Sequence, residues 1–283
     1  MLKLQRAAVT RLTDVGAQAA ACLRLELETW PKPGLVSHVD CGSHDDMDAG
    51  TFRASAAALE PYFQALAEAG SRGIGLGRLR GIGIEAEAAM LAATNGANTH
   101  RGAIFGLGLL CAAAGARLGG HAPRHWSLGE TVARLWGGAV RQAPVSALSH
   151  GSKVRRRFGA GGARYEAASG FPSIYEIGLP ALLRATRKAP EDTEAARVEA
   201  CFALIAALED TNLLHRGGLA GLRFARAAAR GFLEAGGVGT PDWRHHAYHV
   251  HEQFVARRLS PGGSADLLAM SVFVKAWDGE TAR

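Results

Sequence analysis

Residues 94–115 read TNGANTHRGAIFGLGLLCAAAG, a polar phrase that ends in His100-Arg101-Gly102 and runs into the longest apolar stretch of the chain. The apolar part, 103–115, is too short to span a bilayer and is interrupted by glycine. It favours a buried helix instead. The first N–H groups of such a helix, beside a His and an Arg, suit the capture of an anion.

A similar phrase returns at 210–217, which reads DTNLLHRG and again places an Asn before His-Arg-Gly between two apolar segments. The copies stand about 115 residues apart, far more than a solenoid period, which leaves two explanations open. They are either an internal duplication or two convergent helix starts. Both predict one site built from the two halves, for a ligand with more than one phosphate group.

Helical periodicity dominates the rest of the chain. Ala and Gly are abundant while β-branched and aromatic residues are sparse, and no stretch alternates as a strand would. We predict one all-α domain over residues 1–283, of about ten helices. Their expected ranges are 5–28, 50–69, 84–94, 99–117, 127–141, 173–187, 193–209, 218–235, 242–257 and 264–277.

Composition limits the partners and the compartment. The net charge of +6 fits a polyanionic ligand, but the basic residues are dispersed, which disfavours nucleic acid. Four widely spaced cysteines suggest neither disulfides nor a zinc cluster, so a reducing cytoplasm is expected. Charged residues interrupt the first twenty positions, and we expect neither a secretory signal nor a membrane span. A homodimer is left open.

Several familiar nucleotide and hydrolase motifs are missing. There is no Walker phosphate loop and no Gly-x-Ser-x-Gly elbow. The glycines of 73–77 follow a helical pattern and not a strand, so a dinucleotide fingerprint is not indicated. We interpret 73–83 as a Gly-rich linker and 159–166 as a loop.

Acidic residues in or beside the loops are candidates for chemistry. In the loop Asp45-Asp46-x-Asp48, Asp48 either caps the next helix or joins its neighbours in holding Mg²⁺ on a triphosphate. Glu87 is favoured over Glu85 to face a site. Asp210 is placed at the end of an apolar helix, where the dipole opposes a carboxylate, which points to a functional role.

The histidines of 244–251 are interpreted as surface residues. His245 and His249 share a helical face, but no Glu follows the first His as a zinc protease motif requires.

Taken together, the loop phrases resemble the triphosphoribosyl-dephospho-CoA synthases, which make the prosthetic-group precursor of citrate lyase and malonate decarboxylase. The resemblance runs from about residue 26 to residue 273. It rests on the phrases PKPGLV (31–36), GSHxDM (42–47), NTHRGAIF (98–105), GARxEA (162–167), GFP (170–172), DTN (210–212) and SPGGSADLL (260–268).

The resemblance implies a pentosyl transfer between ATP and 3′-dephospho-CoA, with Mg²⁺ accompanying ATP. The 2′-hydroxyl of dephospho-CoA attacks C1 of the ATP ribose, adenine leaves, and the triphosphate is retained. The phosphates are then handles and not the reacting centre, which agrees with the absence of a phosphate loop.

Roles for individual residues follow from that reaction as expectations. We expect Asp210 or Glu166 to be the base on the acceptor hydroxyl. We expect Asp46, Glu87 and Asp266 to position Mg²⁺. The expected substrate-binding residues are Lys32, His44, Asn98, His100, Arg101, Arg164, Asn212, His215, Arg216, Gly262, Gly263 and Ser264.

One position departs from the family. An Asp commonly follows the PKPGLV phrase, but this chain has Ser37 and then His38. Either Asp40 replaces that Asp, or this member acts on a different nucleotide acceptor.

Overall fold

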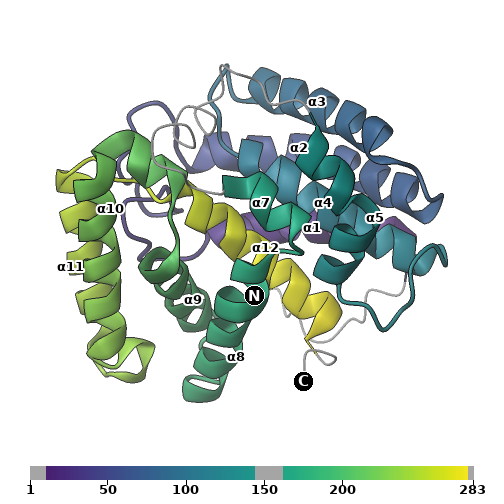
Figure 1. Cartoon of the computed structure of the whole chain (residues 1–283). Coiled ribbons are helices and arrows are strands. Elements are labelled where there is room, and N and C mark those ends of the chain that lie inside the picture. The colour runs from purple at the N-terminus through teal and green to yellow at the C-terminus, as the bar shows by residue number, and fades with distance from the viewer. Residues whose placement is uncertain (1–10, 144–161, 280–283) are drawn as a thin grey trace.

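The computed structural model describes residues 11–143 and 162–279 (Figure 1). These residues form eleven α-helices and no strand, so the all-α prediction is confirmed. The helices are α1 (Val15–Leu27), α2 (Ala49–Ser71), α3 (Leu76–Ala93), α4 (Arg101–Leu118), α5 (Leu128–Gln142), α7 (Gly162–Ala168), α8 (Leu179–Lys188), α9 (Thr193–Ala207), α10 (Thr211–Glu234), α11 (Trp243–Ala256) and α12 (Gly262–Asp278).

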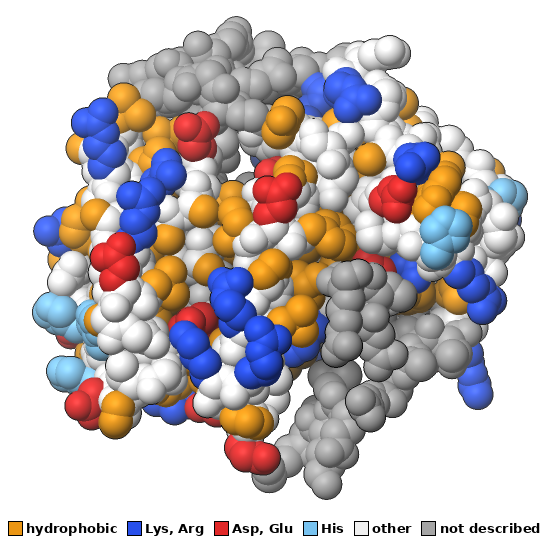
Figure 2. All heavy atoms as spheres, turned by 60° about the horizontal axis from the view of Figure 1, so that its bottom comes forward, with side chains coloured by type: hydrophobic (Ala, Val, Ile, Leu, Met, Phe, Trp, Pro, Cys, Tyr) orange, Lys and Arg blue, Asp and Glu red, His pale blue; other side chains and the backbone are white. Residues whose placement is uncertain are grey.

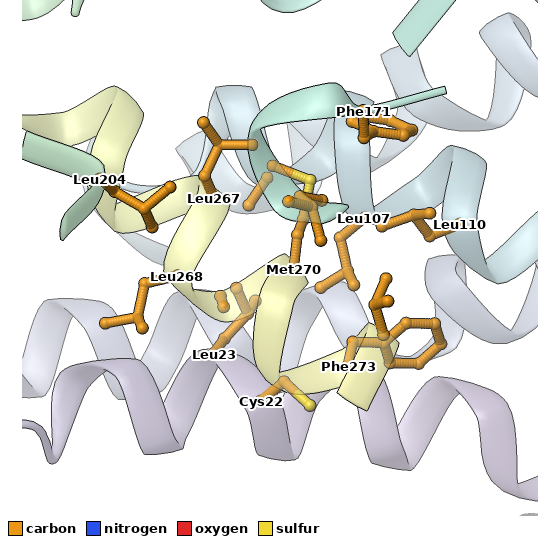
Figure 3. Close-up of a cluster of buried hydrophobic side chains, with 14 of the residues drawn as sticks. Cys22, Leu23, Leu107, Leu110, Phe171, Leu204, Leu267, Leu268, Met270 and Phe273 are labelled. Atoms are coloured by element: carbon orange, nitrogen blue, oxygen red, sulfur yellow. The ribbon is translucent and has the colours of Figure 1, made fainter. Parts of the chain in front are cut away.

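Helix α12 runs through the middle of the molecule (yellow in Figure 1), between a group formed by α8 to α11 and a group formed by α2 to α5. Its side chains Leu267, Leu268, Met270 and Phe273 are buried against residues of α1, α4 and α9 (Figure 3). Its first turn lies where the two groups meet, because Ser264 donates to Asp210 at the start of α10 and Asp266 lies against Gly102 of α4.

Helix α4 is apolar on every side because it is a core helix. Its backbone lies directly against α2: a methyl group on Gly70 would overlap the carbonyl of Ala112, and one on Gly115 would overlap the carbonyl of Ala67. Among the described helices it is the one long and apolar enough to be tested as a membrane span, but 72% of it is buried inside the protein. Its composition is that of a helix buried all round.

Side-chain caps set several helix starts. Asp48 accepts hydrogen bonds from the backbone N–H and the hydroxyl of Thr51, both at 2.8 Å, at the start of α2. The capping alternative for Asp48 is therefore confirmed. Ser127 and Asp192 cap α5 and α9 in the same way.

Two segments predicted as loops are helical. The 73–83 linker ends at Gly75, because Leu79 and Ile82 of α3 are buried with Met90, and this burial outweighs the poor helix propensity of glycine. Residues 162–166 begin α7, while 159–161 lie outside the described residues. The first helix starts at Val15 and not at 5; residues 5–10 are also outside the described part.

The boundary between α9 and α10 corrects the prediction for Asp210. α9 ends at Ala207 and α10 begins at Thr211, with Asp210 as its N-cap. The helix was predicted to begin at 218 but begins at Thr211, and within it the backbone of Gly218 is non-helical (φ 59°). The dipole argument for Asp210 is thus wrong, because the carboxylate faces the positive end of a helix.

On the surface, Lys and Arg side chains are interspersed with Asp and Glu over the described part of the face in Figure 2. No single basic stripe is visible on that face.

Candidate functional site

A cavity of about 1260 Å³ lies where the two helix groups meet. Its lining comes from the loop before α2, the starts of α4, α7, α10 and α12, and one side of α1. Ligand pockets are usually about 300–1,000 Å³, so this cavity has room for more than one nucleotide-sized molecule.

Most of the predicted site residues meet in this cavity although they are far apart in sequence. Those that line it are His44, Asp46, Asn98, His100, Arg101, Arg164, Glu166, Asp210, Asn212, His215, Arg216, Gly262, Gly263 and Asp266. Both copies of the His-Arg-Gly phrase contribute, from the start of α4 and from the first two turns of α10.

Three predicted residues do not line the cavity. Lys32 is fully buried and forms an ion pair with Glu26, which does line it. Ser264 lies behind Asp210 and is bonded to it. Glu87, on α3, lies 2.5 Å from the guanidinium of Arg101 and so faces a cation of the site.

The carboxylate of Asp210 joins two helix starts. Oδ1 accepts from the backbone N–H groups of Asn212 (2.9 Å) and Leu213 (3.4 Å) in α10. Oδ2 accepts from the backbone N–H (2.8 Å) and the hydroxyl (3.0 Å) of Ser264 in α12. Burial raises the pKa of Asp210, and these hydrogen bonds oppose that rise. Because all four acceptor positions are used, Asp210 has little capacity left to take a proton.

Three carboxylates form what we call the acidic floor of the cavity: Glu26, Asp210 and Asp266. Burial, and then the charges of Glu26 and Asp210, raise the pKa of Asp266 well above its usual value. Gly102 allows this arrangement, because a methyl group there would overlap Oδ2 of Asp266. The charges of Glu26 and Asp210 thus disfavour a further negative charge at Asp266, next to the backbone of α4.

Glu26 was not predicted from the sequence. It is 4% exposed, and burial raises its pKa while the ion pair with Lys32 lowers it. A possible signal is present: Glu26 interrupts the apolar positions of α1, and a buried carboxylate needs a partner, here Lys32.

Basic side chains that line the cavity define a second region, the basic rim: His44, Arg101, His215 and Arg216. Arg216 donates from Nη1 to the carbonyls of Ser43 (3.1 Å) and Arg258 (3.2 Å), and its Nη2 lies 3.2 Å from Nδ1 of His44. Burial and the charge of Arg216 lower the pKa of His44. His44 also lies 2.8 Å from the hydroxyl of Ser260. Arg216 thus holds two loops together beside the cavity.

Helix α7 brings Arg164 and Glu166 to the cavity. Arg164 donates to the carbonyls of Val140 and Ala143 at the end of α5, a common partner for a cation. Glu166 accepts from the backbone N–H (3.1 Å) and the hydroxyl (2.7 Å) of Ser173. Each of its oxygens receives one bond, so the carboxylate keeps acceptor capacity toward a ligand.

Asp40 does not take the place of a carboxylate in the cavity. It accepts from the indole N–H of Trp30 (3.1 Å) and lies 3.4 Å from Nε2 of His251. The prediction of a surface histidine cluster is correct for His245 and His249, but wrong for His251, which is buried and lies 2.7 Å, through Nδ1, from the carbonyl of Lys32.

A magnesium ion fits the cavity only together with substrate oxygens. Within 11–143 and 162–279, no group of three or more His, Cys, Asp or Glu side chains is arranged to hold a metal. Mg²⁺ commonly uses one or two carboxylates plus phosphate oxygens. Asp46 lines the cavity, lies 3.6 Å from His44 and suits that role, whereas Asp266 lies in the acidic floor and Glu87 lies against Arg101.

The chain is similar to known proteins over most of its length. The family model described as CitG: ATP:dephospho-CoA triphosphoribosyl transferase matches residues 12–282. A probable 2-(5''-triphosphoribosyl)-3'-dephosphocoenzyme-A synthase of Pseudomonas aeruginosa (strain UCBPP-PA14) is 43% identical over 256 residues, 88% of this chain and 85% of the relative. One of Azotobacter vinelandii is 44% identical over 261 residues, 90% and 88% of the two chains. No solved structure matches.

The bonding of Asp210 predicts a large structural effect on replacement. Asp210→Ala leaves buried donors of two helices without an acceptor, so the free energy of unfolding should fall by about 3 kcal/mol or more. Urea denaturation followed by far-ultraviolet circular dichroism measures this. Asp48→Ala is the matched control, since it removes an exposed N-cap of α2. Its loss should be smaller, and equal losses would contradict the joint role of Asp210.

Proposed function

We infer that this chain, which belongs to the CitG family of ATP:dephospho-CoA triphosphoribosyl transferases, is a transferase that moves the 5-triphosphoribosyl group of ATP to the 2′-hydroxyl of 3′-dephospho-CoA and releases adenine. The structural observation that supports this function is the cavity. It combines an acidic floor, a basic rim and room for two nucleotides.

The reaction exchanges one bond at C1 of the ATP ribose. The bond from C1 to N9 of adenine breaks and its electron pair stays on adenine, while an oxygen–carbon bond forms from the acceptor 2′-hydroxyl. The hydroxyl proton is removed, and adenine gains a proton as it leaves. Positive charge develops on the ribose, and nearby carboxylates stabilise it, as in glycoside chemistry.

The two regions of the cavity match the charges of the substrate. The acidic floor suits the ribose, which carries hydroxyl donors and becomes positive during the reaction. The basic rim suits the triphosphate, and we place the phosphate groups near Arg101, His215 and Arg216. Attack from the face opposite adenine would invert the β-linkage of ATP to an α-linkage.

We propose Glu166 as the base on the acceptor hydroxyl. The sequence left Asp210 and Glu166 as alternatives, and the hydrogen bonds of Asp210 favour Glu166. Lys32, paired with Glu26, is proposed to hold that carboxylate in the floor rather than to touch phosphate. Gly262 and Gly263 allow the start of α12 to approach Asn212 and Asp210, because a methyl group on either glycine would meet those side chains.

Mg²⁺ is proposed to accompany ATP and to be held by its phosphate oxygens with Asp46, which lies beside His44. Bound there, it would neutralise part of the triphosphate charge. We also propose a cytoplasmic location, since the four cysteines are widely spaced, and a homodimer stays a prediction.

The activity itself can be measured directly. With ATP, Mg²⁺ and 3′-dephospho-CoA, the protein should release adenine in equal amount to a triphosphoribosyl product, as quantified by liquid chromatography and mass spectrometry. The 2′-deoxy acceptor should give no product, and chelation of Mg²⁺ should lower the rate. Adenine release without acceptor would indicate a hydrolase, and tight ATP binding without adenine a non-catalytic protein.

Arg101 provides a test of the basic rim. Arg101→Ala should raise KM for ATP by about 10- to 100-fold, the value of a hydrogen bond to a charged group, with a smaller change in kcat. Steady-state kinetics of adenine release measure both constants. Arg124→Ala is the control, because Arg124 is exposed and does not line the cavity. An unchanged KM for both substrates would refute the assignment.

Glu166 provides a test of the proposed base. Glu166→Gln should lower kcat by about 10²- to 10⁴-fold, because the amide cannot take the hydroxyl proton. Glu176→Gln, ten residues along and exposed, is the control and should keep kcat. If Glu166→Gln keeps a near-normal kcat, the base is another residue.

A further inference from the structure

Within the described residues, a single buried side-chain nitrogen or oxygen lacks a hydrogen-bond partner: Nε2 of His100. The residue is 3% exposed and lines the cavity. Buried polar atoms in folded proteins are nearly always bonded, so an orphan at a ligand cavity calls for an explanation. The explanation offered by the cavity is a substrate atom.

The other ring nitrogen defines which tautomer His100 adopts. The hydroxyl of Thr99 donates to that of Ser55 (2.7 Å), and Ser55 lies 2.7 Å from Nδ1 of His100. Ser55 accepts from Thr99, and Nδ1 is the acceptor recorded for its hydroxyl among the described residues, so we assign the Ser55 proton to Nδ1. The neutral imidazole then carries its proton on Nε2, which makes the orphan atom a donor.

His100 is neutral, so it is poorly suited to a phosphate group. Burial, and then the charge of Lys32, lower its pKa to about 3. The cations of the basic rim are better partners for phosphate, and the side chain of Arg101 is about half exposed at its edge. A neutral donor in a buried site suits a neutral acceptor instead.

The surroundings of His100 match a purine base. The ring of Phe52 packs edge-on against it with 4.9 Å between centroids, and Phe52, Met47 and Phe105 all line the cavity. Two residues along, Gly102 lies against Asp266 of the acidic floor, where a triphosphate would be repelled. This part of the cavity therefore favours the base and ribose of ATP over its phosphates.

We infer that His100 donates a hydrogen bond from Nε2 to a ring nitrogen of the adenine of ATP, and that this bond stabilises adenine as the leaving group. The inference rests on the proposed function. As the bond from C1 to N9 breaks, its electron pair spreads over the purine, so N7 and N3 become stronger acceptors. A donor already held in place strengthens its bond at that moment without reorganisation.

This bond is tested by a double-mutant cycle in which one change is made in His100 and the other in a ring nitrogen of ATP. His100→Asn keeps an amide near the position of Nδ1 and loses the donor at Nε2, whereas His100→Gln places an amide nitrogen near Nε2. With ATP and saturating dephospho-CoA, His100→Asn should lower kcat by about 10²-fold, and His100→Gln should retain more of it. Both are compared with the wild type on ATP, 7-deaza-ATP and 3-deaza-ATP.

For one of the two analogues, replacing the acceptor nitrogen by carbon should lower the kcat of the wild type about tenfold more than it lowers the kcat of His100→Asn. The intrinsic effect of each analogue on bond breaking is present in both proteins and cancels in this ratio. Equal ratios for both analogues would overturn the inference. Thermal unfolding of each variant shows whether its fold is retained.

A measurement on the wild-type protein stands independently of catalysis and of the variants. Nitrogen-15 spectra of histidine should show His100 protonated at Nε2, and ATP without acceptor should shift that signal. The matching deaza analogue should shift it less. Protonation at Nδ1, or an equal shift with inorganic triphosphate alone, would overturn the inference. A wild type that binds ATP with the expected shift but releases no adenine would instead refute the proposed function.

Discussion

The site depends on one buried carboxylate placed between two helix starts. Asp210 accepts hydrogen bonds from the first turns of α10 and α12, and both helices direct their positive ends toward it. A buried anion is costly unless donors satisfy it, and here the donors are the backbone groups that a helix start leaves unpaired. The same turns carry Asn212 and Gly262, so the charge that fixes the helices also fixes the cavity wall.

This use of Asp210 shapes the electrostatics of the remaining floor. Burial, and then the charges of Glu26 and Asp210, raise the pKa of Asp266, so the charge of Asp210 reaches its neighbour although its own lone pairs are occupied. Lys32 balances only Glu26, and it does so from behind the cavity wall. The cavity thus separates negative charge at its floor from positive charge at its rim. These charges are complementary to those of ATP during ribosyl transfer, because the sugar becomes positive and the phosphates stay negative.

The sequence predicted the helical class, and most of the site residues that it predicted line the cavity, because periodicity is local and the loop phrases are compact. It failed where a role depends on a distant contact. Glu26 gains its meaning from Lys32 and the cavity, and neither is visible in the helical pattern of α1. The orientation of Asp210 depended on a three-residue gap between α9 and α10, which is smaller than the uncertainty of a predicted boundary. The helical start of α3 was missed because burial outweighed its glycines.

The repeated phrase shows how little a shared motif fixes a shared role. Both copies reach the same cavity, yet their environments differ. Arg101 is paired with Glu87 on α3, while Arg216 holds the carbonyls of two loops. His100 is the N-cap residue of α4 and is buried, with its Nδ1 facing Ser55, whereas His215 lies in the second turn of α10. A site for two copies of one ligand would need matching surroundings. Unequal surroundings are what a cavity for two different nucleotides requires, since one must lose its base while the other offers a hydroxyl.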